Sequence, residues 1–218
     1  FMTWDAGRLM GSDNEDWRVP TRELEERRFR LSKRLAERGI ESVLIDDPVE
    51  LYWLTGGRQN GMILIGAEGS DIQNIHWVKK SISRATFEAG ESDAPDPILP
   101  QPRMNNLEKS IRDLGGNKAP AMLAEKLPHK RWKFFSEKLN NLGKIEDCTP
   151  ILYSLREIKS DWEIEMHRES GRINREMFQA VKEMGGSGRT ELEIAAAADE
   201  VSRTAGFGGR IRMRRWPM

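Results

Sequence analysis

Two capping signatures in the C-terminal part of the chain constrain its fold more than any other feature. Ser160 and Glu163 form an S-x-x-E capping box, and Thr190 and Glu193 form a second one of the type T-x-x-E. Behind each box, apolar residues recur at helical spacing until a glycine is reached, which is the pattern of an amphipathic helix. The sequence therefore predicts two helices here. Residues 156–218 are too few for a robust core of their own, so both helices require a partner surface.

The first 150 or so residues have a different pattern, in which short aliphatic runs alternate with helical segments. The runs that predict strands are residues 40–45, 62–65, 72–78, 121–124 and 144–146. The runs that predict helices, most of them closed by glycine, are residues 21–38, 49–54, 81–88, 105–114 and 130–142. Four prolines between residues 90 and 103 predict a loop. Such alternation is typical of a layered α/β domain.

Composition argues against several classes of protein. The 218 residues contain 35 Lys plus Arg and 35 Asp plus Glu, so the net charge gives no general attraction to nucleic acid or an anionic membrane. The single cysteine, Cys148, permits no disulfide within the chain and fits a reducing compartment, so we expect a cytoplasmic protein. No apolar run is long enough to span a membrane, and residues 1–18 show no signal peptide.

Three segments resemble motifs of one superfamily. DPVELYWLTG (residues 47–56) resembles the dp-x-n-l-y-Y-L-T-G signature of the creatinase-type N-terminal domain, with Glu50 in place of Asn and Trp53 in place of Tyr. LREIKSDWEI (residues 155–164) resembles the l-R-x-i-K-s-x-x-E-i segment that opens the catalytic domain. GRTELEI (residues 188–194) resembles G-x-T-E-x-E-i. In this order, the segments resemble the creatinase/prolidase/aminopeptidase P superfamily.

The resemblance implies an α/β fold: a creatinase-type N-terminal domain with a mixed sheet flanked by helices, then the first two helices of an incomplete pita-bread domain. We expect residues 1–20 to form an N-terminal arm, residues 21–154 the creatinase/prolidase-type domain, and residues 155–218 the truncated start of the catalytic domain. In the superfamily, the first domain commonly builds a homodimer and walls the neighbouring active site. The second commonly binds two divalent metal ions (Mn, Co or Zn) and cleaves Xaa-Pro bonds.

The superfamily's metal ligands are two Asp, one His and two Glu, and all five lie after the second catalytic-domain helix. Residues 206–218 contain no Asp, Glu or His, so we expect no metal ligand, no catalytic residue and no bound cofactor in this chain. The loop around Trp53 and Arg58 offers an aromatic face and a cation, which makes these two residues substrate-binding candidates. Local packing is the alternative that we favour.

We therefore expect the N-terminal portion of a metal-dependent Xaa-Pro peptidase-like hydrolase. The chain by itself is expected to be inactive, and the longer protein to act on a peptide or a small molecule. Two alternatives stay open. One is a non-catalytic module for self-association, and the other is a creatinase- or lyase-type enzyme on the same fold, because the fold does not fix the reaction.

For the other polar residues we favour a structural interpretation. Glu163 and His167 have the i, i+4 spacing of a shared metal site, but such pairs are ordinary neighbours on a charged helix surface. His76 falls in an expected strand, so we expect a packed or a surface histidine there. Cys148 has no His nearby in sequence, so we expect it to be a small buried apolar residue. His129 opens a helix and has no partner in the sequence.

The last residues combine glycine and arginine. Residues 206–209 (GFGG) follow a helix instead of linking a strand to a helix, so we expect no phosphate cradle. The four arginines of residues 210–215, with Trp216, are compatible with an acidic or nucleic-acid partner. Ile211 and Met213 alternate with them, however, as in a half-buried strand. We therefore expect a strand of the second domain and no nucleic-acid partner.

Overall fold

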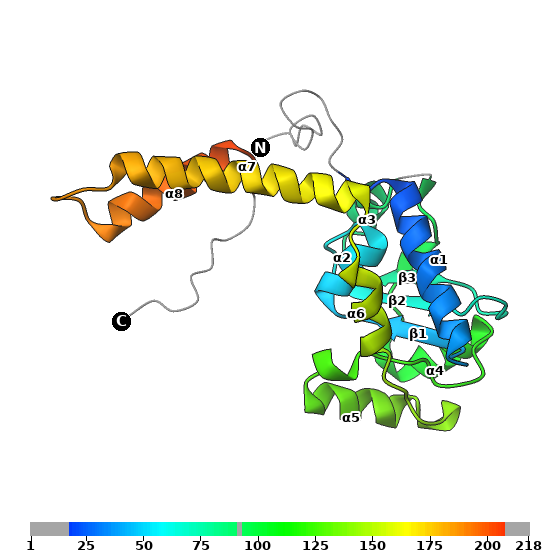
Figure 1. The fold of residues 1–218 in the computed structure, drawn as a ribbon. Helices are drawn as coiled ribbons and strands as arrows, with labels where there is room; N and C mark the ends of the chain where they lie inside the picture. Colours follow the sequence, from blue (N-terminus) through cyan, green and yellow to red (C-terminus); the bar gives the residue numbers. More distant parts are fainter. Residues whose placement is uncertain (1–17, 91–92, 208–218) are drawn as a thin grey trace. The chain divides into compact units, whose positions relative to one another are not determined.

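The computed structural model describes residues 18–90 and 93–207, which form parts of two compact units (Figure 1). The first unit, described over residues 18–158, is an α/β structure. Its α-helices are α1 (Thr21–Glu37), α2 (Pro48–Thr55), α3 (Ile82–Glu88), α4 (Leu107–Asp113), α5 (His129–Lys138) and α6 (Thr149–Glu157). Its strands are β1 (Ser42–Ile45), β2 (Gly61–Gly66), β3 (Ile75–Val78) and β4 (Ile98–Pro100). Short 3-10 turns occur at Met104–Asn106, Ala124–Lys126 and Asn140–Leu142.

The sheet is mixed, with the described strands in the order β1-β2-β3-β4. The pairs β1–β2 and β2–β3 are antiparallel, whereas β3 and β4 are parallel. Beyond β1, isolated parallel bridges join Val43 to Ala121 and Met122 to Asp147. The chain therefore runs in the same direction in β1, β3, β4 and the segments around residues 121 and 147, and their carboxyl ends lie at one edge of the sheet.

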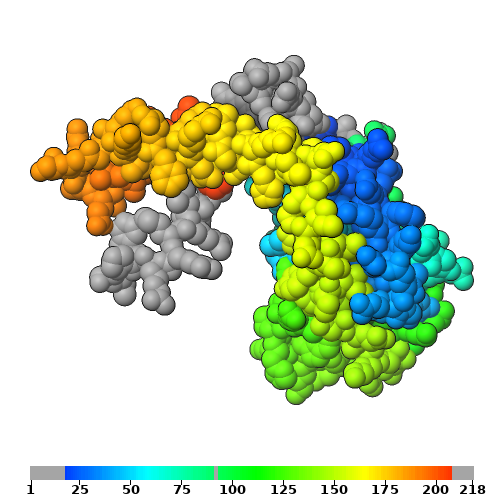
Figure 2. All heavy atoms as spheres, viewed as in Figure 1, coloured from blue at the N-terminus to red at the C-terminus, as the bar shows by residue number. Residues whose placement is uncertain are grey.

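Helices cover both faces of this sheet, because alternate strand residues point to opposite sides. On one face, Val43 and Ile63 belong to a buried cluster with apolar residues of α1, α2 and α6. On the other face, Leu44 and Leu64 belong to a second cluster with residues of α4 and α5. Helices α1 and α6 lie side by side on the first face, as the space-filling view also shows (Figure 2). The result is a three-layer unit, as the sequence predicts.

The sheet differs from the prediction in four segments. The strand expected over residues 72–78 begins only at Ile75, and the Asn74 side chain instead accepts a hydrogen bond from Gly66 N at 2.9 Å. The proline-rich loop contains β4, because the Pro97 carbonyl accepts from His76 N and Gln101 N donates to Val78 O. The strands expected over residues 121–124 and 144–146 are reduced to the isolated bridges.

Helix α6 (Thr149–Glu157) is not among the helices that the sequence predicts. Pro150 lies in its first turn, where the missing N–H removes no helical hydrogen bond. Ile151, Leu152 and Leu155 form its buried stripe and join the core cluster of α1 and α2. Helix α6 spans the expected domain boundary at residues 154/155, and its buried apolar residues join the core of the first unit.

The second unit contains α7 (Asp161–Met184) and α8 (Glu191–Thr204), which pack against each other. Both predicted capping boxes are confirmed. Glu163 N donates to Ser160 Oγ at 3.1 Å and Ser160 N donates to the Glu163 carboxylate at 3.0 Å. Thr190 and Glu193 make the equivalent pair of bonds at the start of α8. No residue of α7 is buried, so its apolar stripe has no core within the described part of this unit.

Some expectations lie outside the described residues. These are most of the arm over residues 1–20 and the strand containing Ile211 and Met213. The division into domains at residues 20/21 and 154/155 stays a prediction. Within the described ranges, none of the helices combines the length and the apolar character that a membrane crossing requires.

Candidate functional site

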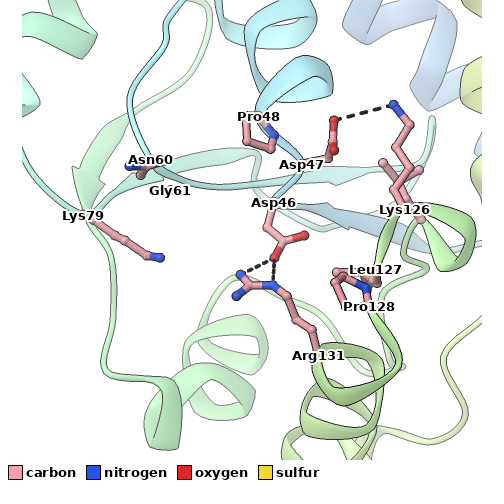
Figure 3. Close-up of a pocket in the computed structure, with 11 residues that line it drawn as sticks. Asp46, Asp47, Pro48, Asn60, Gly61, Lys79, Lys126, Leu127, Pro128 and Arg131 are labelled. Atoms are coloured by element: carbon pink, nitrogen blue, oxygen red, sulfur yellow. Dashed lines mark hydrogen bonds and ion pairs between the residues drawn. The ribbon is translucent and has the colours of Figure 1, made fainter. Parts of the chain in front are cut away.

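A pocket of about 290 Å³ lies at the edge of the sheet where β1 and β3 end (Figure 3). Asp46 and Asp47 follow β1 directly, and Lys79 follows β3 directly. Asn60 and Gly61, at the start of the antiparallel β2, lie between these two strand ends. The remaining lining residues are Pro48 and a segment beyond the bridge at residues 121–122, consisting of Leu123, Lys126, Leu127, Pro128 and Arg131. Ligands of open α/β sheets commonly bind at this edge, outside the carboxyl ends of the strands.

The two carboxylates of the pocket are held in fixed positions. Asp46 Oδ2 accepts from Arg131 Nε at 2.6 Å and also contacts Arg131 Nη2. Asp47 caps α2, accepting from Val49 N and Glu50 N at 3.0 and 3.1 Å. Asp47 Oδ1 also lies 3.6 Å from Lys126 Nζ. Neither aspartate therefore needs a ligand to satisfy its charge.

Glu50, in the first turn of α2, lies behind the pocket and holds its wall together. Its carboxylate is fully buried, and Oε1 accepts from Lys126 Nζ at 2.5 Å and from Arg156 Nη1 at 2.6 Å. Burial lowers the pKa of Lys126, but the hydrogen bond and charge of Glu50 outweigh it, so the pKa is raised overall. The Lys126 ammonium also lies 5.6 Å from the centre of the Tyr153 ring. These contacts tie α2, the turn at residues 124–126 and α6 together.

The two predicted substrate-binding residues do not line this pocket. Trp53 is 4% exposed and belongs to the core cluster, with the Arg27 guanidinium 5.3 Å from its ring centre. Arg58 is exposed, and its backbone N–H donates to Glu88 at 3.0 Å. The structure thus buries one candidate and leaves the other at the surface. A role of either in substrate binding stays a prediction.

The structure places the other polar residues considered in the sequence at ordinary buried or surface positions. Cys148 is buried, and burial raises the pKa of its thiol to about 12, which leaves no thiolate near neutral pH. His76 is buried in β3. The Glu163 carboxylate accepts from Ser160 N in its capping box, and His167 is exposed one turn further along α7. His129 is exposed at the start of α5.

Metal ions are implied by the superfamily that the sequence resembles, but the described residues do not fit a metal site. Within residues 18–90 and 93–207, no group of three or more His, Cys, Asp or Glu side chains is placed to hold an ion. Asp46 and Asp47 are neighbours in the pocket, yet each is already engaged with a cation. No chemical step through a metal can be derived from these residues.

The sequence does contain an indication of this pocket, although the family motifs do not point to it: charged residues directly follow two of the expected strands. Asp46 and Asp47 directly follow the strand expected over residues 40–45, and Lys79 directly follows the one expected over residues 72–78. Charged residues that directly follow two strands running in the same direction are brought to one edge of the sheet. The order and direction of the strands, which the sequence leaves open, are needed to see that these residues meet.

The fold and its chain direction define a creatinase-type α/β domain, and comparison with known proteins agrees. Residues 27–158 match the family profile of the creatinase/prolidase N-terminal domain. The chain belongs to this family, and thereby to the creatinase/prolidase/aminopeptidase P superfamily. A search of the curated proteins finds no significant match.

Solved structures give the same fold at low sequence identity. The prolidase from Pyrococcus horikoshii OT3 aligns with a TM-score of 0.67 at 20% identity, covering 83% of this chain and 49% of its own. For the Xaa-Pro dipeptidase from Bacillus anthracis, the TM-score is 0.69 at 19% identity, with coverage of 84% and 50%. For the X-Pro aminopeptidase from Thermotoga maritima MSB8, the values are 0.65, 22%, 82% and 49%. The chain spans about half the length of these proteins.

Proposed function

We propose that this chain is the N-terminal portion of a metal-dependent Xaa-Pro peptidase-like hydrolase. The observation that carries the proposal is the family match over residues 27–158, which places the creatinase/prolidase N-terminal domain in the chain. The shared fold with a prolidase, an Xaa-Pro dipeptidase and an X-Pro aminopeptidase supports it. The chemistry then belongs to two divalent metal ions, Mn, Co or Zn, held by a longer protein.

Within that protein, this chain serves self-association and the walling of an active site. The exposed apolar side chains of the second unit support a role in packing against further protein. Phe178 of α7 is 76% exposed and Leu192 of α8 is 71% exposed, which leaves apolar surface on both helices for further protein to cover. We place the protein in the cytoplasm as a homodimer with a peptide or small-molecule substrate, and with no nucleic-acid or membrane partner. Trp53 and Arg58 remain the candidates for substrate contact.

Thermal unfolding with and without Mn²⁺ tests the metal-dependent part of this proposal. A ligand that binds only the folded state raises its stability, by about 2.7 kcal/mol at a hundred times its dissociation constant. We expect Mn²⁺ to raise the melting temperature of the protein encoded by the complete reading frame by several degrees. The 218-residue chain should show no shift at the same concentration. An equal shift in both proteins, or in neither, would contradict the proposal.

A further inference from the structure

The pocket at the carboxyl edge of the sheet has more positive than negative side chains. Its two carboxylates, Asp46 and Asp47, face the three cations Lys79, Lys126 and Arg131. Arg131 is engaged by Asp46, and Lys126 by Asp47 and the buried Glu50. These contacts account for both carboxylates of the lining and for two of its three cations.

Lys79 is the cation that remains. Its side chain extends into the hollow toward Asp46 and Arg131 (Figure 3). Among the described residues, no hydrogen bond or ion pair engages its ammonium, whereas its backbone N–H donates to Asn60 O at 2.8 Å. The backbone of Lys79 is therefore fixed at the end of β3, and its side chain carries the uncompensated charge of the pocket.

The walls of the pocket suit a compact ligand. A volume of about 290 Å³ lies at the small end of the range for ligand sites, which favours a compact molecule. Pro48, Leu123, Leu127 and Pro128 supply apolar surface between the charges. At the entrance to β2, a Cβ on Gly61 would meet Trp77 O at 1.9 Å, so the backbone there is packed as closely as only glycine allows.

The start of α5 adds to the positive potential. Pro128, the residue before the helix, and Arg131 in its first turn both line the pocket. No side chain caps this ten-residue helix, and its first turn holds no acidic residue, so the first N–H groups of the helix are left uncapped at the positive end of its dipole. The dipole and Lys79 act on the same hollow and favour the same sign of ligand charge.

We propose that this pocket binds a small molecule through a carboxylate or phosphate group that pairs with Lys79. Asp46 and Asp47 are already paired with Arg131 and Lys126, so the anionic group of the ligand balances the charge of Lys79. The remaining atoms of the ligand contact the proline and leucine side chains of the walls. This binding function needs no metal and no peptidase activity, so it stands or falls separately from the proposed function.

Titration of the isotope-labelled 218-residue chain with inorganic phosphate and, separately, with succinate tests the proposal by NMR. We expect saturable shifts of the Gly61 and Lys79 amide signals with at least one of the two anions. Saturation by phosphate alone identifies a phosphate ligand, and saturation by succinate alone identifies a carboxylate ligand. If neither anion saturates these signals, the proposal is wrong.

Two matched variants separate a site from general attraction. Lys79→Gln removes the unpaired charge and is expected to weaken binding about tenfold, the usual effect of losing one charge-assisted hydrogen bond. Lys80→Gln removes an equal charge from the next residue, which is exposed as Lys79 is but does not line the pocket, and should change binding less than about twofold. Equal weakening by both substitutions would overturn the proposal, because it would show that the anions respond to the general positive charge of the surface and not to Lys79 in the pocket.

Discussion

Replacing Arg28 with methionine is expected to lower the free energy of unfolding of the sheet unit by about 3–5 kcal/mol, the usual cost of removing one partner of a buried ion pair. Arg28 Nη1 lies 2.5 Å from Asp96 Oδ2, and the two side chains are only 6% and 8% exposed. Arg28 Nε also donates to Leu54 O at 2.8 Å. The substitution leaves the Asp96 carboxylate buried beside an apolar side chain.

The titration of the pair is consistent with this cost. Burial lowers the pKa of Arg28 even though Asp96 and Glu25 raise it, and burial raises the pKa of Asp96 even though Arg28 lowers it. The opposite charge, and for Asp96 also a hydrogen bond from the Asn74 side chain, offsets part of the cost of burial for each group. Adding Asp96→Asn to Arg28→Met removes the orphaned charge and should recover part of the lost stability.

Urea unfolding followed by tryptophan fluorescence measures the effect, since Trp53 and Trp77 are buried in the two core clusters. Arg34→Met is the matched control on the same helix. Arg34 pairs with Glu37 at 2.9 Å, but these side chains are 58% and 45% exposed, so this loss should stay within about 0.5 kcal/mol. Similar losses for Arg28→Met and Arg34→Met would show that the buried pair has no special weight.

The second large effect is a loss of stability in acid that depends on His76. The imidazole is 2% exposed, and neither ring nitrogen has a hydrogen-bond partner among the described residues. Burial, followed by the nearby Arg28 charge, lowers the pKa of His76 to about 4 from an ordinary value of 6.5. The folded state therefore favours neutral imidazole, whereas the unfolded chain takes up the proton near pH 6.5.

The direction of the pH dependence follows from this difference. The contribution of His76 is fully present above pH 6.5 and is lost as the pH falls toward about 4, where the folded state also becomes protonated. The two pKa values correspond to a loss of about 3 kcal/mol over this range. Asp96, whose pKa is raised, acts in the opposite direction near its own pKa.

His76→Leu isolates this term, because leucine has no titrating group and suits the buried position. The unfolding free energy of the variant minus that of the original chain should increase as the pH falls from 6.5 to 4, because only the original chain loses the contribution of neutral His76. Urea titrations at several pH values in this range provide the measurement. If the unfolding free energies of the two proteins fall in parallel with pH, groups other than His76 cause the acid sensitivity.

The sequence predicts those parts of the fold that local signals determine. Ser160 with Glu163, and Thr190 with Glu193, place the starts of α7 and α8 correctly because a capping box involves only neighbouring residues. Helix α6 was missed because Pro150 interrupts the pattern that precedes its short apolar stripe. The strand β4 was missed because its three residues gain hydrogen bonds only from β3, and local propensity does not report such pairing.

The candidate site was less predictable than the fold. Sequence reasoning identified Trp53 through its place in the family signature, but α2 turns this side chain into the core beneath Arg27. Lys79 and Arg131 are 52 positions apart in the numbering and meet only because β3 and α5 end and begin at the same edge of the sheet. Whether two such distant residues line the same pocket depends on the order of the strands, which a single sequence does not determine.

Cleavage of an Xaa-Pro dipeptide is the measurement that tests the proposed function most directly. The protein encoded by the complete reading frame would be assayed for proline release with and without Mn²⁺, beside the 218-residue chain at the same concentration. We predict metal-dependent release by the complete protein and none by the 218-residue chain. Proline release by the chain alone, or no release by the complete protein with Mn²⁺, Co²⁺ or Zn²⁺, would contradict the assignment.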